Sequence, residues 1–415
     1  KLVFLLCCLA FATLVFAQLE EQVEVRLMEI WVKVTDNHDH PITDLGMNDF
    51  QLFIDGKKSE LRCFDHSNPD SSIADSDIED SFNPPTKGGR KYFFYFDLLN
   101  TQPGDFEYLK KKFVDYVHES FRPPDQAMIF ALLPSMRLGV VQKMTTDKES
   151  IISTVNKMKG NPSLLAKERT RESQLLDVLY PGDTTQENQP SASTAAGPRF
   201  MDTFHTARMM ARSFAAEEKQ QSRLTAESFL TIANYMGSNS FDGRLILVYI
   251  SGGFSMKPGM QYHQLVQDAI EKQQGILTGD FRLIEYPSSD FQSEVRNVIG
   301  KLNRLNVTIY AIDTKGAISF DRSPDRINGA SKIDSLETGA ELQDSLFFLA
   351  QETGGTAFIN NRSYDRALAN IRTDMDEQYL LCADVPVEVS KGYHQIKVKV
   401  NRPDVNVRHR KGFSG

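Results

Sequence analysis

Three short apolar runs, each followed by a small polar cluster, limit what this chain can fold into more than any other feature. They are KYFFYFD at 91–97, RLILVYI at 244–250 and NVTIYAI at 306–312. Runs of this length without polar alternation are typical of strands buried on both faces of a parallel sheet. Helical patterns separate the runs, as the crossovers of such a sheet require. The sequence therefore predicts an α/β domain built on a doubly wound, mostly parallel sheet.

The residues that follow these runs predict a binding edge. The carboxyl ends of parallel strands meet at one edge of an open sheet, and ligands of such sheets bind there. We therefore expect a single rim at this edge. The rim consists of Asp97, Asn100, Thr101, Ser251, Gly252, Gly253 and Asp313.

Both ends of the chain carry a different pattern. Within 18–65 and 377–415, apolar and polar residues alternate with the two-residue period of half-buried strands, as at Ile396 and Val398. Neither segment has enough strands for independent stability. We expect one β-sandwich built from both segments, with the α/β domain of 91–376 inserted between them.

Two segments lack the pattern of regular structure. Residues 66–90 are rich in Asp, Ser, Pro and Gly and poor in apolar side chains, which predicts an acidic linker. Residues 161–222 carry no strand signal and include a polar tract at 181–199. We expect an irregular insertion here that covers one face of the domain near its binding end. Helices are expected through 200–236.

The first residues have the pattern of a secretory signal peptide. Lys1 precedes an apolar stretch that ends in Val15-Phe16-Ala17, which predicts a signal peptide over 1–17. The stretch is shorter than the roughly 20 residues that cross a bilayer. An uncleaved N-terminal anchor is the alternative. We expect an exported protein in the periplasm, the cell envelope or the extracellular space.

After cleavage, two of the four cysteines remain, Cys63 and Cys382. Each lies in a strand-like stretch near one end of the chain, and disulfides persist in exported proteins. Two interpretations follow: a disulfide that ties the two ends together, or two buried free thiols that behave as small apolar groups.

Charge and motifs favour a binding protein over an enzyme. The 55 acidic residues outnumber the 47 basic ones, so the composition gives no support for nucleic-acid binding. The sequence has no Gly-x-Ser-x-Gly, no His-Glu-x-x-His and no phosphate-binding glycine motif. His205 and His263 fall in predicted helices rather than just after a rim strand. A hydrolase with Ser251 as nucleophile is therefore the less favoured interpretation.

The order of these segments resembles the von Willebrand factor A domain. It is most similar to exported bacterial proteins described as VWFA-related, and the match covers most of the chain outside 66–90 and 161–222. The segments that carry the resemblance are VEVRLMEIWVKV, KYFFYFD, FRPPDQAMIFALLP, GRLILVYISGGFS, NVTIYAIDTKG, LAQETGGTAFINN and HQIKVKVNRPDVNVRHRKGF.

The resemblance implies a degenerate metal-ion-dependent adhesion site for Mg²⁺ or Mn²⁺. Members place Asp-x-Ser-x-Ser after the first strand, then a Thr, then an Asp after the fourth strand. This chain has Leu99 at the first Ser and Gly252 at the second Asp. The candidate metal ligands are Asp97, Thr101, Thr225 and Ser251. Either a partner's carboxylate completes this site, or the rim recognises partners without metal.

Together these observations predict an exported, non-enzymatic binding or adhesion module for a protein partner in the cell envelope. If the module binds a metal, we expect the partner to present a carboxylate. An alternative is a structural subunit of an envelope complex, in which the β-sandwich makes the contacts. A hydrolase that uses the same rim is the third interpretation.

Overall fold

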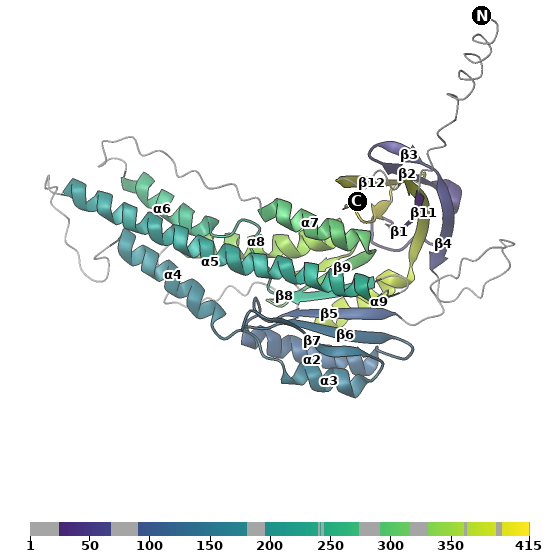
Figure 1. Ribbon diagram of the computed structural model, residues 1–415, viewed down its shortest axis with the longest axis horizontal. Coiled ribbons are helices and arrows are strands. Elements are labelled where there is room, and N and C mark those ends of the chain that lie inside the picture. Colours follow the sequence, from purple (N-terminus) through teal and green to yellow (C-terminus); the bar gives the residue numbers. More distant parts are fainter. Residues whose placement is uncertain are drawn as a thin grey trace, which may run out of the picture.

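The computed structural model describes residues 25–67, 90–180, 196–239, 241, 245–273, 291–315, 331–360, 363–386 and 392–414. The predicted signal peptide and nearly all of the predicted acidic linker lie outside these ranges. Figure 1 shows an α/β body with antiparallel sheets at one end and helices that project from the other. Of the helices in the described ranges, none is long and apolar enough to cross a bilayer.

The described part of the body is built on a six-stranded sheet with the order β7-β6-β5-β8-β9-β10. All neighbouring strands are parallel except β6 and β7. Counted along the sheet, the order is 3-2-1-4-5-6, which is typical of doubly wound folds. The predicted mostly parallel α/β sheet is confirmed. The strands are β5 (Lys91–Asp97), β6 (Gln126–Leu132), β7 (Leu138–Thr145), β8 (Leu245–Ser251), β9 (Val307–Asp313) and β10 (Ala357–Phe358).

Helices cover both faces of this sheet because its strands are apolar on both sides. In β5, Tyr92 and Phe94 pack toward α2, α3 and α9, whereas Phe93 and Tyr95 pack toward α5, α7 and α8. The apolar side chains thus form one core on each face of the sheet. The helices are α2 (Pro103–Glu119), α3 (Lys148–Lys157), α5 (Ala196–Ser238), α7 (Phe291–Arg304), α8 (Ser331–Glu352) and α9 (Tyr364–Asp376).

Two antiparallel sheets each combine strands from both ends of the chain, in the orders β13-β1-β11-β4 and β14-β12-β2-β3. Buried side chains of both sheets belong to one hydrophobic cluster, among them Val32, Leu52, Leu381 and Ile396. The strands are β1 (Val25–Thr35), β2 (Phe50–Ile54), β3 (Lys57–Ser59), β4 (Leu61–Ser67), β11 (Gln378–Pro386), β12 (Tyr393–Val400), β13 (Asn406–Arg408) and β14 (Gly412–Ser414); a 3₁₀ turn at Met47–Asp49 precedes β2.

Where the structure describes it, the insertion at 161–222 is helical. The prediction of irregular structure is wrong for 164–179, whereas the helices predicted through 200–236 are present. Residues Leu164–Leu179 form α4, and 196–222 form the first part of α5. These segments pack against α6 (Met260–Gln273) around Leu175 and Phe204, in a hydrophobic cluster of their own. We call α4, residues 196–222 of α5, and α6 the helical arm, which projects beyond the sheet in Figure 1. The apolar side chains of α4 pack against two distant segments, so the pattern within 164–179 alone is weak.

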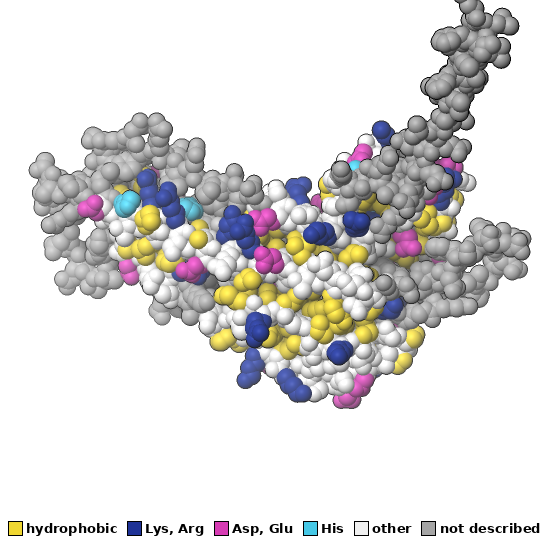
Figure 2. Space-filling view, viewed as in Figure 1, with side chains coloured by type: hydrophobic (Ala, Val, Ile, Leu, Met, Phe, Trp, Pro, Cys, Tyr) yellow, Lys and Arg dark blue, Asp and Glu magenta, His cyan; other side chains and the backbone are white. Residues whose placement is uncertain are grey.

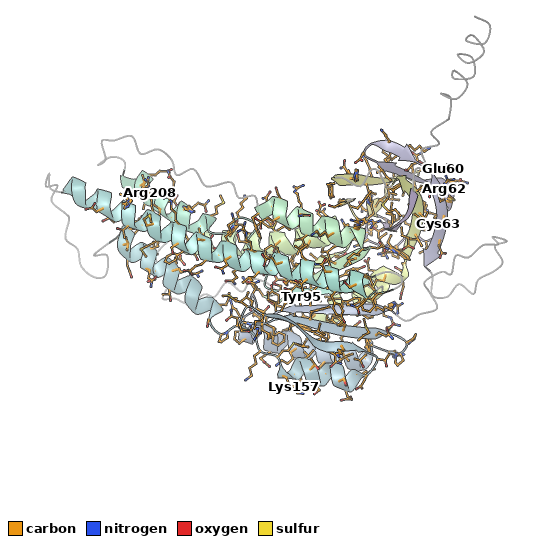
Figure 3. All side chains as sticks on the ribbon, in the orientation of Figure 1. Glu60, Arg62, Cys63, Tyr95, Lys157 and Arg208 are labelled. Atoms are coloured by element: carbon orange, nitrogen blue, oxygen red, sulfur yellow. A yellow bond between two sulfur atoms is a disulfide. The ribbon has the colours of Figure 1, made fainter. Side chains whose placement is uncertain are left out.

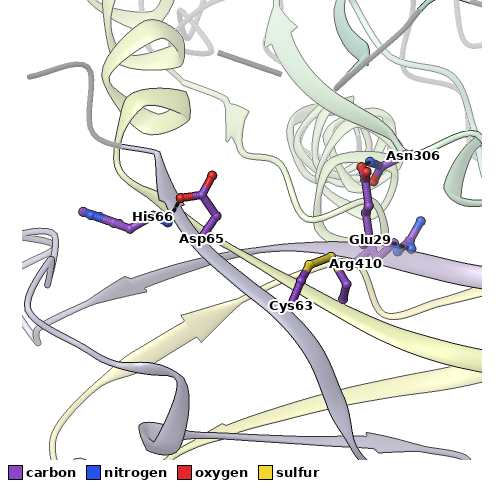
Figure 4. The surroundings of a disulfide bond; sticks show 7 residues. Glu29, Cys63, Asp65, His66, Asn306 and Arg410 are labelled. Carbon is purple, nitrogen blue, oxygen red and sulfur yellow. Dashed lines mark hydrogen bonds between the residues drawn. A yellow bond between two sulfur atoms is a disulfide. The ribbon is translucent and has the colours of Figure 1, made fainter. Parts of the chain in front are cut away.

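Cys63 of β4 and Cys382 of β11 form a disulfide, as Figure 4 shows. The two residues face each other in the antiparallel pairing of these strands, and their Cα atoms are 4.9 Å apart. Of the two sequence interpretations, the structure therefore has the bridge rather than two free thiols. It joins positions that are 319 residues apart in the chain.

Candidate binding rim

Asp97 lies at the centre of the rim, where β5 ends beside β8. This is the point of the sheet at which the strand order reverses, and where doubly wound folds form their binding crevice. Its side chain is fully buried. Oδ2 of Asp97 accepts hydrogen bonds from Nδ2 of Asn100 at 2.7 Å, the hydroxyl of Tyr249 at 2.8 Å and Oγ of Ser251 at 2.9 Å. One carboxylate oxygen therefore serves three donors.

The electrostatics of Asp97 follow from these contacts. Burial raises the pKa of the Asp97 carboxyl, while the hydrogen bonds from Asn100, Tyr249 and Ser251 oppose the rise. The hydroxyl of Thr101 does not reach the carboxylate, because it donates to the Asp97 backbone carbonyl at 2.8 Å. The predicted ligand Thr101 thus stabilises the turn after β5.

Asn100 connects the rim to α5. Its Nδ2 also donates to Oγ1 of Thr225 at 2.9 Å, and its Oδ1 accepts from Nε2 of Gln221 at 2.7 Å. Thr225 and Gln221 lie one turn apart on α5. One turn further along, Ser228 hydrogen-bonds the hydroxyl of Tyr95, which lies beneath α5 in Figure 3. The structure therefore brings Thr225 to the rim, 125 residues away from Asn100 in the sequence.

Gly252 and Gly253 allow the loop after β8 to pack directly on the rest of the rim. A Cβ atom on Gly252 would lie 2.4 Å from the backbone carbonyl oxygen of Asn100. Gly253 has a φ of +83° and donates its N–H to Oγ of Ser251 at 3.0 Å. No side chain fits at Gly252, the position where the resemblance places a second aspartate.

Asp313 follows the neighbouring strand β9, and its carboxylate is engaged elsewhere. Its Oδ1 accepts from the N–H of Lys315 at 2.9 Å, and its Oδ2 accepts from Nε2 of Gln343 of α8 at 2.8 Å. Burial raises the pKa of Asp313, and these donors oppose the rise. Asp313 therefore belongs to the rim by position but to a different hydrogen-bond cluster than Asp97.

The residues at the rim do not fit a divalent cation. Mg²⁺ requires oxygen ligands in octahedral geometry, and Mn²⁺ also favours oxygen ligands. Here the amide nitrogen of Asn100 lies between Asp97 and Thr225, and its hydrogens point at the oxygens that a cation would need. Within the described ranges, no group of three or more His, Cys, Asp or Glu side chains could hold a metal ion.

Sequence reasoning missed three side chains that complete the rim: Tyr249, Gln221 and Gln343. Two of them left a local signal. Tyr249 precedes Ser251 by two residues and so shares its face of β8. Gln221 precedes Thr225 by four residues and so shares its face of α5. Gln343 comes from a distant helix, and no local pattern links it to Asp313.

No family model and no curated protein matches the chain. Among solved structures, it is similar to an aerotolerance-related membrane protein from Bacteroides fragilis NCTC 9343, with 11% identity over 69% of this chain and 99% of that chain, at TM-score 0.30. It is similar to the hypothetical protein BatB from Bacteroides thetaiotaomicron, with 12% identity over 69% and 98%, at TM-score 0.24. A third is proximal thread matrix protein 1 from the mussel byssus with a zinc-occupied MIDAS motif, with 9% identity over 71% and 47%, at TM-score 0.28.

The TM-scores of these structures lie well below 0.5, so the fold assignment rests on the strand order of the chain's own sheet. The zinc named for the mussel byssus protein is a property of that protein alone.

Proposed function

We propose that this chain is an exported, non-enzymatic binding module that recognises an acidic protein partner of the cell envelope through its helical arm. The observation that carries the proposal is a basic face on α5. His205, Arg208, Arg212, Lys219 and Arg223 are spaced by three, four, seven and four residues, which places them on one side of a helix. Figure 2 shows Lys, Arg and His side chains over α5 and α6 on this side of the arm, with some Asp and Glu side chains among them.

The charge of this face contrasts with that of the whole chain. The chain carries a formal net charge of −8. The basic face of the arm therefore attracts acidic partners, whereas the rest of the surface, which is acidic on balance, repels them. From Arg208 to Arg223 the helix rises about 22 Å. Arg208 is labelled on the arm in Figure 3. At the end nearer the sheet, Arg223 pairs with Glu294 of α7, with nitrogen–oxygen distances of 3.0 and 2.6 Å.

The rim supports a binding module rather than a hydrolase. Ser251 is fully buried, and its hydroxyl donates to Asp97 rather than to an imidazole. A nucleophilic serine instead needs a base within hydrogen-bond reach and access to substrate. His205 and His263 both lie on the arm.

We infer that the two antiparallel sheets form one β-sandwich that carries the α/β domain, because they share a hydrophobic cluster. In the alternative function, this sandwich makes the contacts of an envelope complex. Loss of partner binding in variants of the arm would favour the arm, and unchanged binding would favour the sandwich, which lies at the opposite end of the molecule in Figure 1.

The test compares the wild-type chain with Arg212→Glu/Lys219→Glu and with Lys157→Glu/Lys159→Glu as a matched control. The control makes the same change of charge at exposed positions at and just beyond the end of α3. Each protein is used as bait against solubilised envelope proteins, and retained proteins are identified by mass spectrometry. We expect wild type and control to retain the same partner proteins, and the arm variant to retain at least tenfold less of them. Equal retention by all three would contradict a role for the arm.

A further inference from the structure

We propose that the side-chain amide of Asn100 takes the place of a divalent cation and fastens the helical arm to the sheet without metal. The disagreement between the family pattern and the residues present motivates this inference. It concerns the architecture of the rim and holds whichever partner the arm recognises.

The amide meets the geometric needs of this position on its own. Its two N–H groups point to different oxygens, Oδ2 of Asp97 at 2.7 Å and Oγ1 of Thr225 at 2.9 Å. Its carbonyl oxygen accepts from Gln221 at 2.7 Å. A cation would bridge the same carboxylate and hydroxyl. Because Asp97 and Thr225 are fully buried and Asn100 is nearly so, water does not compete for these hydrogen bonds.

The loop that carries Asn100 is held from two sides. On one side, Gly252 packs against the Asn100 carbonyl group. On the other side, the backbone N–H of Asn161 donates to the Thr101 carbonyl at 2.7 Å, and Nδ2 of Asn161 donates to the Leu99 carbonyl at 2.9 Å. Asn100 therefore has little freedom to move away and admit an ion.

These contacts make the loop after β5 one attachment point of the arm, beside the part of α5 that packs on the sheet. Asn161 lies three residues before the start of α4, the first helix of the arm. Gln221 and Thr225 belong to α5, where the arm meets the sheet. Both ends of the α4–α5 segment therefore hold the same short loop, and Asn100 is the side chain that connects it to α5.

Asn100→Asp is the decisive variant because it keeps the shape of the side chain and removes both donors. It places a second carboxylate against Asp97 in a buried site, where two like charges repel. A divalent cation between the carboxylates would relieve this repulsion and supply the bridge that the amide provided. Asn303→Asp is the matched control, since Nδ2 of the buried Asn303 also bridges two acceptors, the carbonyls of Glu352 and Gly412.

The experiment measures thermal midpoints of the full chain in EDTA and in millimolar Mn²⁺ or Mg²⁺. We expect the wild-type midpoint to be the same in both, Asn100→Asp to melt lower in EDTA, and Mn²⁺ to recover part of that loss. Asn303→Asp should melt lower in EDTA without recovery. Hydrogen exchange of α4 and of 196–222 should rise in Asn100→Asp and fall again with Mn²⁺.

Several results would overturn the proposal. A wild-type midpoint that rises with Mn²⁺ or falls with EDTA would show that an ion displaces the amide, and this result stands even if no variant folds. Recovery of Asn303→Asp by Mn²⁺ to the same extent would show a general effect of metal. Asn100→Ala with the melting point and exchange of wild type would show that Asn100 does not fasten the arm.

Discussion

At the scale of single residues, a buried polar group lowers the stability of the fold unless its hydrogen bonds are made. Tyr249 and Ser251 of β8 and Asn100 of the loop after β5 together satisfy the Asp97 carboxylate. Removing one partner would leave a buried acceptor without its hydrogen bond. The rim is therefore sensitive to changes that leave its shape intact but alter one donor.

His409 provides a pH-dependent test at this scale. The buried imidazole accepts from the N–H of Val398 at 3.2 Å and donates to the carbonyl of Arg410 at 2.7 Å. Burial lowers the pKa of His409 from 6.5 to about 4. Between these values the unfolded chain binds a proton that the folded chain does not, so stability falls as the pH falls. The linkage amounts to about 3 kcal/mol across this window.

We expect His409→Gln to lose this part of the pH dependence. Urea denaturation between pH 7 and pH 4 gives the unfolding free energy of each protein, and the slope against pH is the quantity to compare. His38→Gln, a change at an exposed position, should keep the wild-type slope. Equal slopes for His409→Gln and wild type would show that folding does not change the protonation of His409.

At the scale of elements, the helical arm is held together by side chains from three segments. Leu175 of α4 packs with Phe204 and Ala207 of α5 and with Val266 of α6. This cluster is separate from the two hydrophobic cores that cover the faces of the sheet. The arm therefore depends on its own small core for stability, in addition to the attachment through Asn100.

Leu175→Ala should open the arm before the body unfolds. Truncating a buried leucine costs about 2–5 kcal/mol because of lost burial and the cavity that remains. We expect faster cleavage by limited proteolysis within 164–222, with the sheet strands still protected. Met209→Ala is the control, since Met209 on the same arm is 52% exposed and should leave the cleavage rate unchanged. Protection of the arm in Leu175→Ala would argue against a separate core.

At the scale of the whole molecule, polar contacts join the terminal sheets to the α/β body. Asp374 of α9 is bound by the guanidinium of Arg408 of β13 and by the hydroxyl of Tyr310 of β9 at 2.6 Å. Burial raises the pKa of Asp374, but the charge and hydrogen bonds of Arg408 outweigh it and hold the pKa below its usual range. Near the disulfide, Glu29 of β1 accepts from Asn306 at 3.1 Å, as Figure 4 shows.

Asp374→Asn should uncouple the two parts. Asp374 and Arg408 are only partly buried, so removing one charge costs less than the roughly 3–5 kcal/mol of a fully buried ion pair. The single tryptophan, Trp31 in β1, reports on the terminal sheets, whereas far-UV circular dichroism reports mainly on the helices of the body. We expect the two urea transitions to separate in Asp374→Asn.

Asp365→Asn is the control for this prediction, since Asp365 is exposed on the same helix. Its two transitions should coincide as in wild type. A single, unshifted transition in Asp374→Asn would mean that the terminal sheets and the body unfold together without help from this pair.

The sequence alone determined the strands and their sheet, because a strand buried on both faces must be apolar along its whole length. KYFFYFD at 91–97 shows this pattern without reference to any other segment. The same logic placed Asp97 and Ser251 at one edge. It failed for 164–179, where the helix buries only a few side chains against distant partners.

Only the tertiary structure decided which hydrogen bonds form at the rim and whether a disulfide joins the two ends of the chain. The amide of Asn100 reaches Thr225 across 125 residues, and Cys63 reaches Cys382 across 319. Hydrogen bonds and disulfides depend on positions within a few ångströms, whereas a sequence pattern reports only periodic burial. The pattern could therefore predict where a site lies, but the chemistry of that site came from contacts that no local stretch contains.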